Sequence, residues 1–257
     1  MQTPVERCRV RGTTVLVKRD DLSSPVLGGN KVRALELLFA SVPDNRQLLT
    51  VGPSGSTHAL AVALHGERLG LQAEVLTWPQ EMHAVAAATA ARMREHARVT
   101  ETRSPADAYF RVALRRLRGR VHWIPAGGSS PLGALGHAGA AMELVAQLAR
   151  EGIPMPQYVV VPLGSGGTVA GLLLGFAIAG VVTRVIAVRA VPRIVGNRGQ
   201  VLRLARRSRV LLQRLAGEPV ARIDPSRLVI EHASFGGAYG RETAVASEAA
   251  DGLARAG

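Results

Sequence analysis

One arrangement, a short apolar strand followed by a loop of small residues and then a helix, occurs three times in this chain of 257 residues. The predicted strands are 47–51, 121–125 and 158–163, the loops 52–57, 126–133 and 164–168, and the helices 58–69, 134–150 and 169–179. Further strands are predicted at 73–78, 185–190 and 227–232. Because strands that alternate with helices form parallel sheets, the sequence predicts an α/β fold whose sheets are covered on both faces.

The three small-residue loops all follow directly on predicted strands. In open parallel sheets, ligands bind at the carboxyl ends of the strands. A ligand site is therefore predicted where these loops meet. Domain borders are less distinct in the sequence, and the most favourable places for the chain to cross between domains are residues 43–45 and 127–136.

The stretch from Gly152 to Thr183 contains no charged residue and is long enough to span a bilayer. It is interrupted by Pro154, Pro156 and Pro162 and by a Gly-Ser-Gly-Gly run, which a lipid-facing helix tolerates poorly. A buried strand, a loop and a buried helix explain the segment better. We therefore expect no membrane association.

The formal net charge of +13 suggests nucleic acid or another anionic partner. However, the arginines are spread along the chain, and their densest stretch, 201–215, has apolar residues at helical spacing with arginines on the other face. This pattern favours a solvated amphipathic helix. Aromatic residues make up only 4% of the chain, which leaves few for base stacking. A basic nucleic-acid-binding protein is kept as an alternative, but no nucleic-acid partner is predicted.

Lys31 is one of only two lysines in a chain whose basic residues are otherwise arginine. It follows a Gly-Gly turn and stands at the start of an apolar-periodic helix. Arginine cannot replace lysine where an amine must lose its proton and form a Schiff base, so Lys31 is a candidate for that role. The alternative is a solvated lysine in the first turn of a helix.

The loop 164–168 places four small residues before Thr168 at a strand-to-helix junction. Small residues let backbone N–H groups converge on a phosphate, and the helix dipole also favours an anion there. No Gly-Lys-Ser/Thr follows as in a P-loop, and Val169 occupies the third-glycine position of the dinucleotide fingerprint. A tight turn packed against a helix is the alternative. Together with Lys31, a phosphate site without a dinucleotide signature indicates pyridoxal phosphate as cofactor.

Four motifs in order carry a resemblance to a known family. They are KRDDLSSPVLGGNKVRALELL, GPSGSTHALAVALHGERLGL, IPAGGSSPLGALG and GSGGTVAGL. From about Val15 to its C-terminus the chain resembles the 1-aminocyclopropane-1-carboxylate deaminase/D-cysteine desulfhydrase family, which are pyridoxal-phosphate enzymes of fold type II. The resemblance implies two open parallel-sheet domains with the cofactor cleft between them. The small α/β domain would be 46–136, and the discontinuous large domain 1–45 and 137–257.

The resemblance also implies roles for individual residues. Lys31 matches the Schiff-base lysine of the family and Asn30 its neighbour, while Ser56 and His58 match residues beside the substrate. Tyr239 matches an active-site tyrosine. The phosphate cup corresponds to Gly164, Ser165, Gly166, Gly167 and Thr168. As catalytic residues we expect Lys31, Ser56 and Tyr239.

The chain departs from the family pattern at several positions. Thr57 replaces the cofactor-facing asparagine, and it is expected both to contact the cofactor and, with Ser56, to hold the substrate carboxylate. Gly55 replaces a glutamine, and Ala34 a second lysine near the phosphate. The sequence ends at Gly257, before the family's C-terminal segment, so one side of the cofactor site is expected to be open unless a second subunit covers it.

The expected activity is a pyridoxal-phosphate-dependent deaminase or lyase reaction on a small amino acid of the 1-aminocyclopropane-1-carboxylate or D-cysteine type. The products would be a 2-oxo acid and ammonia, with sulfide from D-cysteine. A degenerate family member that only binds the cofactor, or has a structural role, is the alternative. A homodimer is expected. The histidine spacing predicts no metal site. The single Cys8 and a polar N-terminus suggest a cytoplasmic protein.

Overall fold

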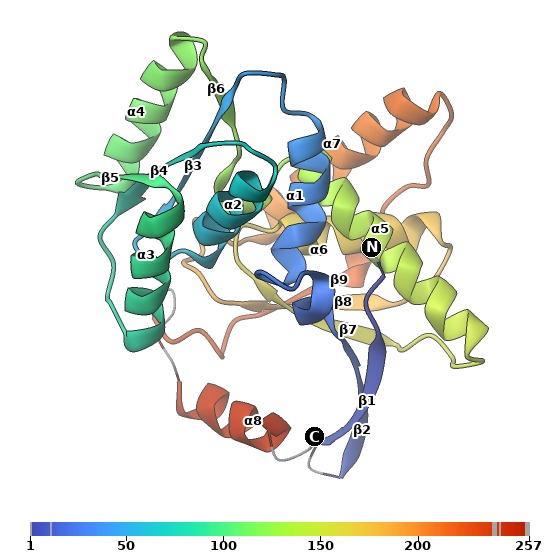
Figure 1. Cartoon of the computed structure of the whole chain (residues 1–257). Coiled ribbons are helices and arrows are strands. Elements are labelled where there is room, and N and C mark those ends of the chain that lie inside the picture. Colours follow the sequence, from blue (N-terminus) through green and yellow to red (C-terminus); the bar gives the residue numbers. More distant parts are fainter. Residues whose placement is uncertain (1, 11, 238–240, 242, 255–257) are drawn as a thin grey trace.

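Two parallel sheets and one antiparallel hairpin organise the chain (Figure 1). The computed structural model describes residues 2–10, 12–237, 241 and 243–254. The hairpin pairs β1 (Val5–Val10) with β2 (Thr13–Lys18), and it lies near the C-terminal helix α8 (Ala244–Ala254) at the bottom of the view. Figure 1 also shows the four-stranded sheet with α3 and α4 on the left, away from the three-stranded sheet.

The four-stranded sheet is formed by the middle of the chain and is covered on both faces. Its order is β5 (Arg98–Glu101), β4 (Ala73–Trp78), β3 (Gln47–Pro53) and β6 (Val121–Trp123), and all neighbours are parallel. Side chains alternate between the two faces of a strand. Val75 accordingly packs with α2 (Thr57–Arg68) and α3 (Ala84–His96), while Leu76 packs with α4 (Pro105–Leu117).

The three-stranded sheet follows in sequence. Its strands β7 (Tyr158–Leu163), β8 (Arg184–Arg189) and β9 (Leu228–Glu231) are parallel in that order. Leu163 and Val185 are buried with α6 (Gly167–Ile178) and α7 (Arg198–Ala216), but Val160 on the other face of β7 is 63% exposed. The expectation of a buried strand covered on both faces is therefore wrong for β7. Its run of valines does not alternate with polar residues, so the pattern contained no sign of an open face.

Helices α1 (Asn30–Ala40), α5 (Pro131–Arg150) and α6 pack in series, α1 on α5 and α5 on α6. Small residues allow the close approach: a Cβ atom on Gly171 of α6 would lie 2.3 Å from the carbonyl oxygen of Ala134 in α5. This packing brings the N-terminal turns of α1 and α6 together. The site described below depends on that juxtaposition.

The predicted strands and helices are all present, with shifts at their ends. Helix α5 begins at Pro131 rather than at 134, because Ser130 caps it by accepting a hydrogen bond from the Gly133 amide and Pro131 suits the first helical position. The loop 164–168 is also shorter than predicted, since α6 begins at Gly167. The hairpin, β5, α4 and α8 were not predicted. The domain borders at 45/46 and 136/137 stay predictions.

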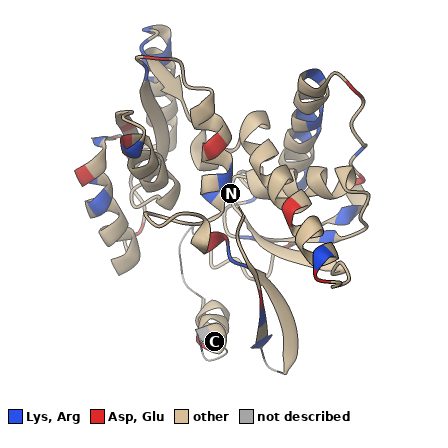
Figure 2. Ribbon diagram, turned by 45° about the vertical axis from the view of Figure 1, so that its right-hand side comes forward, with Lys and Arg blue, Asp and Glu red and all other residues tan. Residues whose placement is uncertain are grey.

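Basic residues are dispersed over many elements rather than gathered on one face (Figure 2). The arginine-rich stretch 201–215 lies within α7, which buries Val201, Leu202 and Ala205 and exposes many of its arginines, as the amphipathic pattern predicts. None of the described helices combines the length and the apolar character that crossing a bilayer requires.

Candidate active site

Lys31 stands in the first turn of α1, and the two glycines before it have a geometric role. A Cβ atom on Gly28 would lie 1.6 Å from the carbonyl oxygen of Asp21, and Gly29 has a φ of 123°. The Gly29 amide donates a hydrogen bond of 2.7 Å to the Asp20 carbonyl. The Gly-Gly pair therefore lets the chain fold back on the Asp20–Ser23 turn, which fixes where α1 begins and where Lys31 points.

The amine of Lys31 is enclosed and only weakly bonded. Its one hydrogen bond among the described residues goes to the Asn30 side-chain oxygen at 3.4 Å. Burial lowers the pKa of Lys31 because the charged form loses hydration. Lys18 differs, since its amine binds the Glu143 carboxylate, the Gln147 side chain and the Thr3 carbonyl. Of the two lysines, only Lys31 has an amine available for chemistry.

The glycine-rich loop faces Lys31 across a small cleft. This cleft is lined by Lys31, Gly127, Pro162, Gly164, Ser165, Gly166, Gly167, Thr168 and Val169. Gly166 has a φ of 91° and begins α6 without a side-chain cap. The N-terminus of α6 thus presents backbone N–H groups and the positive end of the helix dipole to the cleft, an arrangement that suits a phosphate.

Two side-chain contacts hold the loop in place. Ser129 donates a hydrogen bond of 2.6 Å to the Ser165 hydroxyl and accepts one of 3.0 Å from the Gly167 amide. Asn30 donates from its side-chain nitrogen to the Thr168 hydroxyl at 2.8 Å. Asn30 therefore ties α1, which carries Lys31, directly to the first turn of α6.

Two buried histidines that lie near Lys31 complete this region. Burial and then the charge of Lys31 lower the pKa of His137 to about 3, and its Nε2 is 3.5 Å from the Thr168 hydroxyl. The same two causes lower the pKa of His58 to about 3, and the Pro125 carbonyl partly opposes them. The Nδ1 atom of His58 has no hydrogen-bond partner among the described residues. Both rings are therefore neutral near pH 7.

These histidines predict an acid-sensitive fold. Below pH 6.5 the unfolded chain protonates both rings while the folded chain keeps them neutral, so the unfolded state binds more protons and stability falls as pH falls toward 3. Each histidine contributes about 1.4 kcal/mol per pH unit within that window. Urea unfolding from pH 7 to 5 should show the loss. A His137→Gln variant should show a shallower pH dependence, and identical slopes in both proteins would contradict the assignment.

The predicted substrate residues are positioned by the β3–α2 loop. Ser56 is buried and caps α2 by accepting a hydrogen bond of 3.3 Å from the Ala59 amide, and Thr57 is exposed at the first helical position. Gly55 has a φ of 80°, and a Cβ there would lie 2.5 Å from the Ala86 carbonyl oxygen, which explains why a larger residue is absent. His58 is only 4% exposed.

The structure therefore brings part of the predicted site together. Lys31 and the loop 164–168 share one cleft and Asn30 bonds to the loop, whereas Ser56, Thr57 and His58 are not among the described residues that line it. Tyr239 lies outside the described residues. Sequence reasoning missed His137 and Ser129. A histidine within a helix of small apolar residues was the available signal for the first, but nothing in the sequence marked the second.

The residues that line the cleft suit pyridoxal phosphate chemically. A buried amine of lowered pKa faces a helix N-terminus whose glycines leave room for a phosphate: a Cβ on Gly164 would meet no atom within 4 Å. Comparison with known proteins decides the family, because the family described as pyridoxal-phosphate dependent enzyme matches residues 1–257.

The chain belongs to the pyridoxal-phosphate dependent enzyme family. A nocardicin C-9' epimerase from Nocardia uniformis subsp. tsuyamanensis is 37% identical to it over 94% of this chain and 75% of that protein. A 1-aminocyclopropane-1-carboxylate deaminase from Bradyrhizobium sp. (strain BTAi1 / ATCC BAA-1182) is 29% identical over 76% of this chain. The chain spans 65% of the length of that deaminase.

Solved structures agree with this assignment. A homologue of 1-aminocyclopropane-1-carboxylate deaminase superposes with a TM-score of 0.74 at 26% identity, over 95% of this chain and 74% of the other. A threonine deaminase from T.th. gives a TM-score of 0.59 at 27% identity, over 74% and 59% of the two chains. The predicted resemblance, the fold type and pyridoxal phosphate as cofactor are confirmed, and deaminases are among the enzymes that the chain resembles. The roles of single residues, the substrate and the homodimer stay predictions.

Proposed function

We propose that this enzyme is a deaminase or lyase that acts on a small amino acid of the 1-aminocyclopropane-1-carboxylate or D-cysteine type. Each substrate would consume one water and give a 2-oxo acid and ammonia, with hydrogen sulfide as a further product from D-cysteine. The observation that carries the proposal is the buried amine of Lys31 facing the N-terminus of α6 in one cleft. Relatives of the same family that are named as deaminases support the reaction class.

The residues of the chain would divide the work as follows. The loop 164–168 would hold the phosphate, and Asn30 would fix the loop relative to Lys31. Bound pyridoxal phosphate supplies an electron sink for negative charge at the α carbon of the substrate. Lys31 would take and return protons at Nζ, a task for which a lowered pKa is suited because the amine is then neutral in a larger fraction of molecules.

The substrate carboxylate would bind at the N-terminus of α2. Ser56 and Thr57 begin that helix, where free N–H groups and the helix dipole favour an anion, and the Ser56 hydroxyl can donate while it accepts from Ala59. His58 would support this turn as a buried, neutral ring. Thr57 would also contact the cofactor. Tyr239 would assist proton transfer. These assignments rest on the family resemblance.

Epimerisation is the second candidate, because the relative that is 37% identical over 94% of this chain is named as an epimerase. Both reactions break a bond at the α carbon. They differ in whether a proton is then returned to the α carbon or the remainder of the substrate breaks down. A protein that binds the cofactor without catalysing a reaction is the third candidate. The cytoplasmic location stays a prediction.

One set of assays separates these possibilities. Purified protein with pyridoxal phosphate would be incubated in D₂O with 1-aminocyclopropane-1-carboxylate and with both enantiomers of cysteine and serine. A deaminase releases a 2-oxo acid and ammonia, whereas an epimerase interconverts enantiomers and introduces deuterium at the α carbon. We expect 2-oxo acid from at least one substrate. If no product and no deuterium appear with any of them, the proposed activity is wrong.

A further inference from the structure

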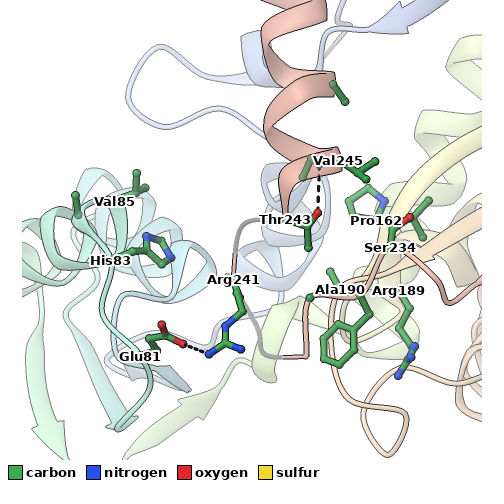
Figure 3. Close-up of a pocket in the computed structure, with 16 residues that line it drawn as sticks. Glu81, His83, Val85, Pro162, Arg189, Ala190, Ser234, Arg241, Thr243 and Val245 are labelled. Carbon is green, nitrogen blue, oxygen red and sulfur yellow. Dashed lines mark hydrogen bonds and ion pairs between the residues drawn. The ribbon is translucent and has the colours of Figure 1, made fainter.

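A large pocket opens beside the Lys31 cleft, between the turn before α3 and the end of β8 (Figure 3). Its volume is about 1050 Å³. Val85, Val188, Phe235 and Val245 contribute to its apolar walls. Pockets of roughly 300–1000 Å³ accept ligands of drug size, so this one is larger than the side chain of a three-carbon amino acid needs.

The pocket and the Lys31 cleft begin at the same edge of one sheet. Pro162 lines both, and in the register of the parallel strands Leu163 of β7 is paired with Arg189 of β8. Neighbouring strands lie roughly 4.8 Å apart. The glycine-rich loop that leaves β7 and the arginine that ends β8 are therefore adjacent, and Pro162 is the residue that the cleft and the pocket share.

Arg189 is the unusual residue of this pocket. It is only 8% exposed, its Nη1 donates to the Val191 carbonyl at 3.4 Å, and its guanidinium carbon lies 4.7 Å from the centre of the Phe235 ring. Among the residues that the structure describes, its Nε has no hydrogen-bond partner and no carboxylate forms an ion pair with it. A buried guanidinium without a counter-ion is unfavourable, so an anionic group of a ligand would stabilise it.

Arg241, a second arginine of the pocket, does not share this property. It pairs with Glu81 at 3.0 Å, and Figure 3 shows it reaching across the pocket toward that carboxylate. The charge of Arg241 is thus already compensated, whereas no carboxylate of the described residues compensates the charge of Arg189. Guanidinium groups bind carboxylates through two parallel hydrogen bonds, which gives them selectivity for such groups over amides.

We propose that this pocket receives the side chain of the amino-acid substrate and that Arg189 binds a carboxylate at the far end of that side chain. The proposal rests on the proposed function, since it extends a substrate that is anchored at the Lys31 cleft. It keeps the Lys31 chemistry of the proposed function and extends the substrate range from small amino acids to those with an acidic side chain. It also predicts that removal of the distal charge weakens recognition.

The test compares acids with their amides. The enzyme loaded with pyridoxal phosphate would be incubated in D₂O with both enantiomers of aspartate, glutamate, 2-aminoadipate, asparagine and glutamine, and deuterium at the α carbon would be measured by mass spectrometry. We expect kcat/KM for exchange to be roughly 10- to 100-fold higher for at least one acid than for its amide, as for a hydrogen-bonded charged group. Arg189→Gln should remove this preference, and Arg189→Lys should restore part of it. Arg193→Gln is the matched control, because Arg193 is exposed and does not line the pocket.

The outcomes distinguish a failure of the role proposed for the pocket from a failure of the proposed function. Equal exchange of acids and amides by the unaltered enzyme would overturn the role of Arg189 while the proposed function stands. A loss of cofactor affinity in Arg189→Gln with the acid preference intact would also overturn it. If none of these amino acids exchanges, turnover of 1-aminocyclopropane-1-carboxylate and cysteine shows whether the proposed function has also failed, and calorimetry with glutarate and glutaramate decides whether the pocket prefers the dicarboxylate. Tighter binding of glutarate would support the pocket, and equal binding would overturn it.

Discussion

Substitution of Lys31 by alanine should leave a folded protein that has lost its catalytic activity. Lys31 sits at a helix entrance where its amine has a single weak hydrogen bond to the described residues, so its removal breaks no network among them that stabilises the fold. Loss of a residue that transfers protons lowers the rate roughly 100- to 10,000-fold. Turnover of the best substrate would be measured together with the thermal unfolding midpoint. The expected result is a collapse of turnover with little change in the midpoint.

Two further variants separate chemistry from charge. Lys31→Arg keeps a cation at the same position but cannot bind the cofactor covalently, so it should be as inactive as the alanine variant. Lys18→Arg should retain activity, because arginine can replace lysine in the ion pair with Glu143. An active Lys31→Arg variant would show that the amine is needed for its charge alone. Loss of activity in Lys18→Arg would indicate that the reaction requires Lys18 rather than Lys31 alone.

Substitution of Gly164 by aspartate should abolish tight binding of the cofactor. Gly164 lines the cleft, and a Cβ there meets no atom within 4 Å, so the new side chain fits without displacing its neighbours. Its carboxylate would lie beside the phosphate dianion. At roughly 4 Å and an effective dielectric constant of about 20, the repulsion is on the order of 4 kcal/mol per pair of unit charges, equivalent to about a 1000-fold loss of affinity.

The controls for Gly164→Asp isolate the charge. Gly164→Asn has nearly the same size without the charge, and Gly164→Ala adds only a methyl group, so both should retain most of the affinity. Gly166 is less suitable for this test because its φ of 91° strains any residue with a side chain. Fluorescence titration with pyridoxal phosphate gives the three dissociation constants. Equal losses in the aspartate and asparagine variants would mean that space rather than charge determines the effect, which would argue against a phosphate at this loop.

The sequence predicted the architecture well where local patterns determine it. The runs 47–51, 73–78 and 158–163 are short, apolar and bounded by small or turn-forming residues, and each forms a parallel strand in the structure. The loop before α6 was identified because glycines at a strand-to-helix junction have few other uses. By contrast, β1 mixes charged and apolar residues in six positions, so its pairing with β2 could not be read from periodicity.

Features that depend on contacts between distant residues could not be predicted. The need for glycine at position 55 arises from the Ala86 carbonyl in the next helix, and the neutrality of His137 arises from its burial near Lys31, where α5 packs on α1 and α6. Arg189 was one of thirty arginines in the sequence and acquired significance only when its burial, and the lack of a counter-ion for it among the described residues, were known. In each case the property depends on neighbours that are distant in the sequence and that only the structure identifies.

The most direct test of the central claim is to locate the cofactor on the chain. The unaltered protein, loaded with pyridoxal phosphate and reduced with borohydride, would be digested with trypsin and examined by mass spectrometry. We predict one modified peptide covering residues 20–33, since trypsin does not cleave at a modified Lys31. A label on the peptide 12–19, which contains Lys18, or on the N-terminal amine alone, would contradict this prediction.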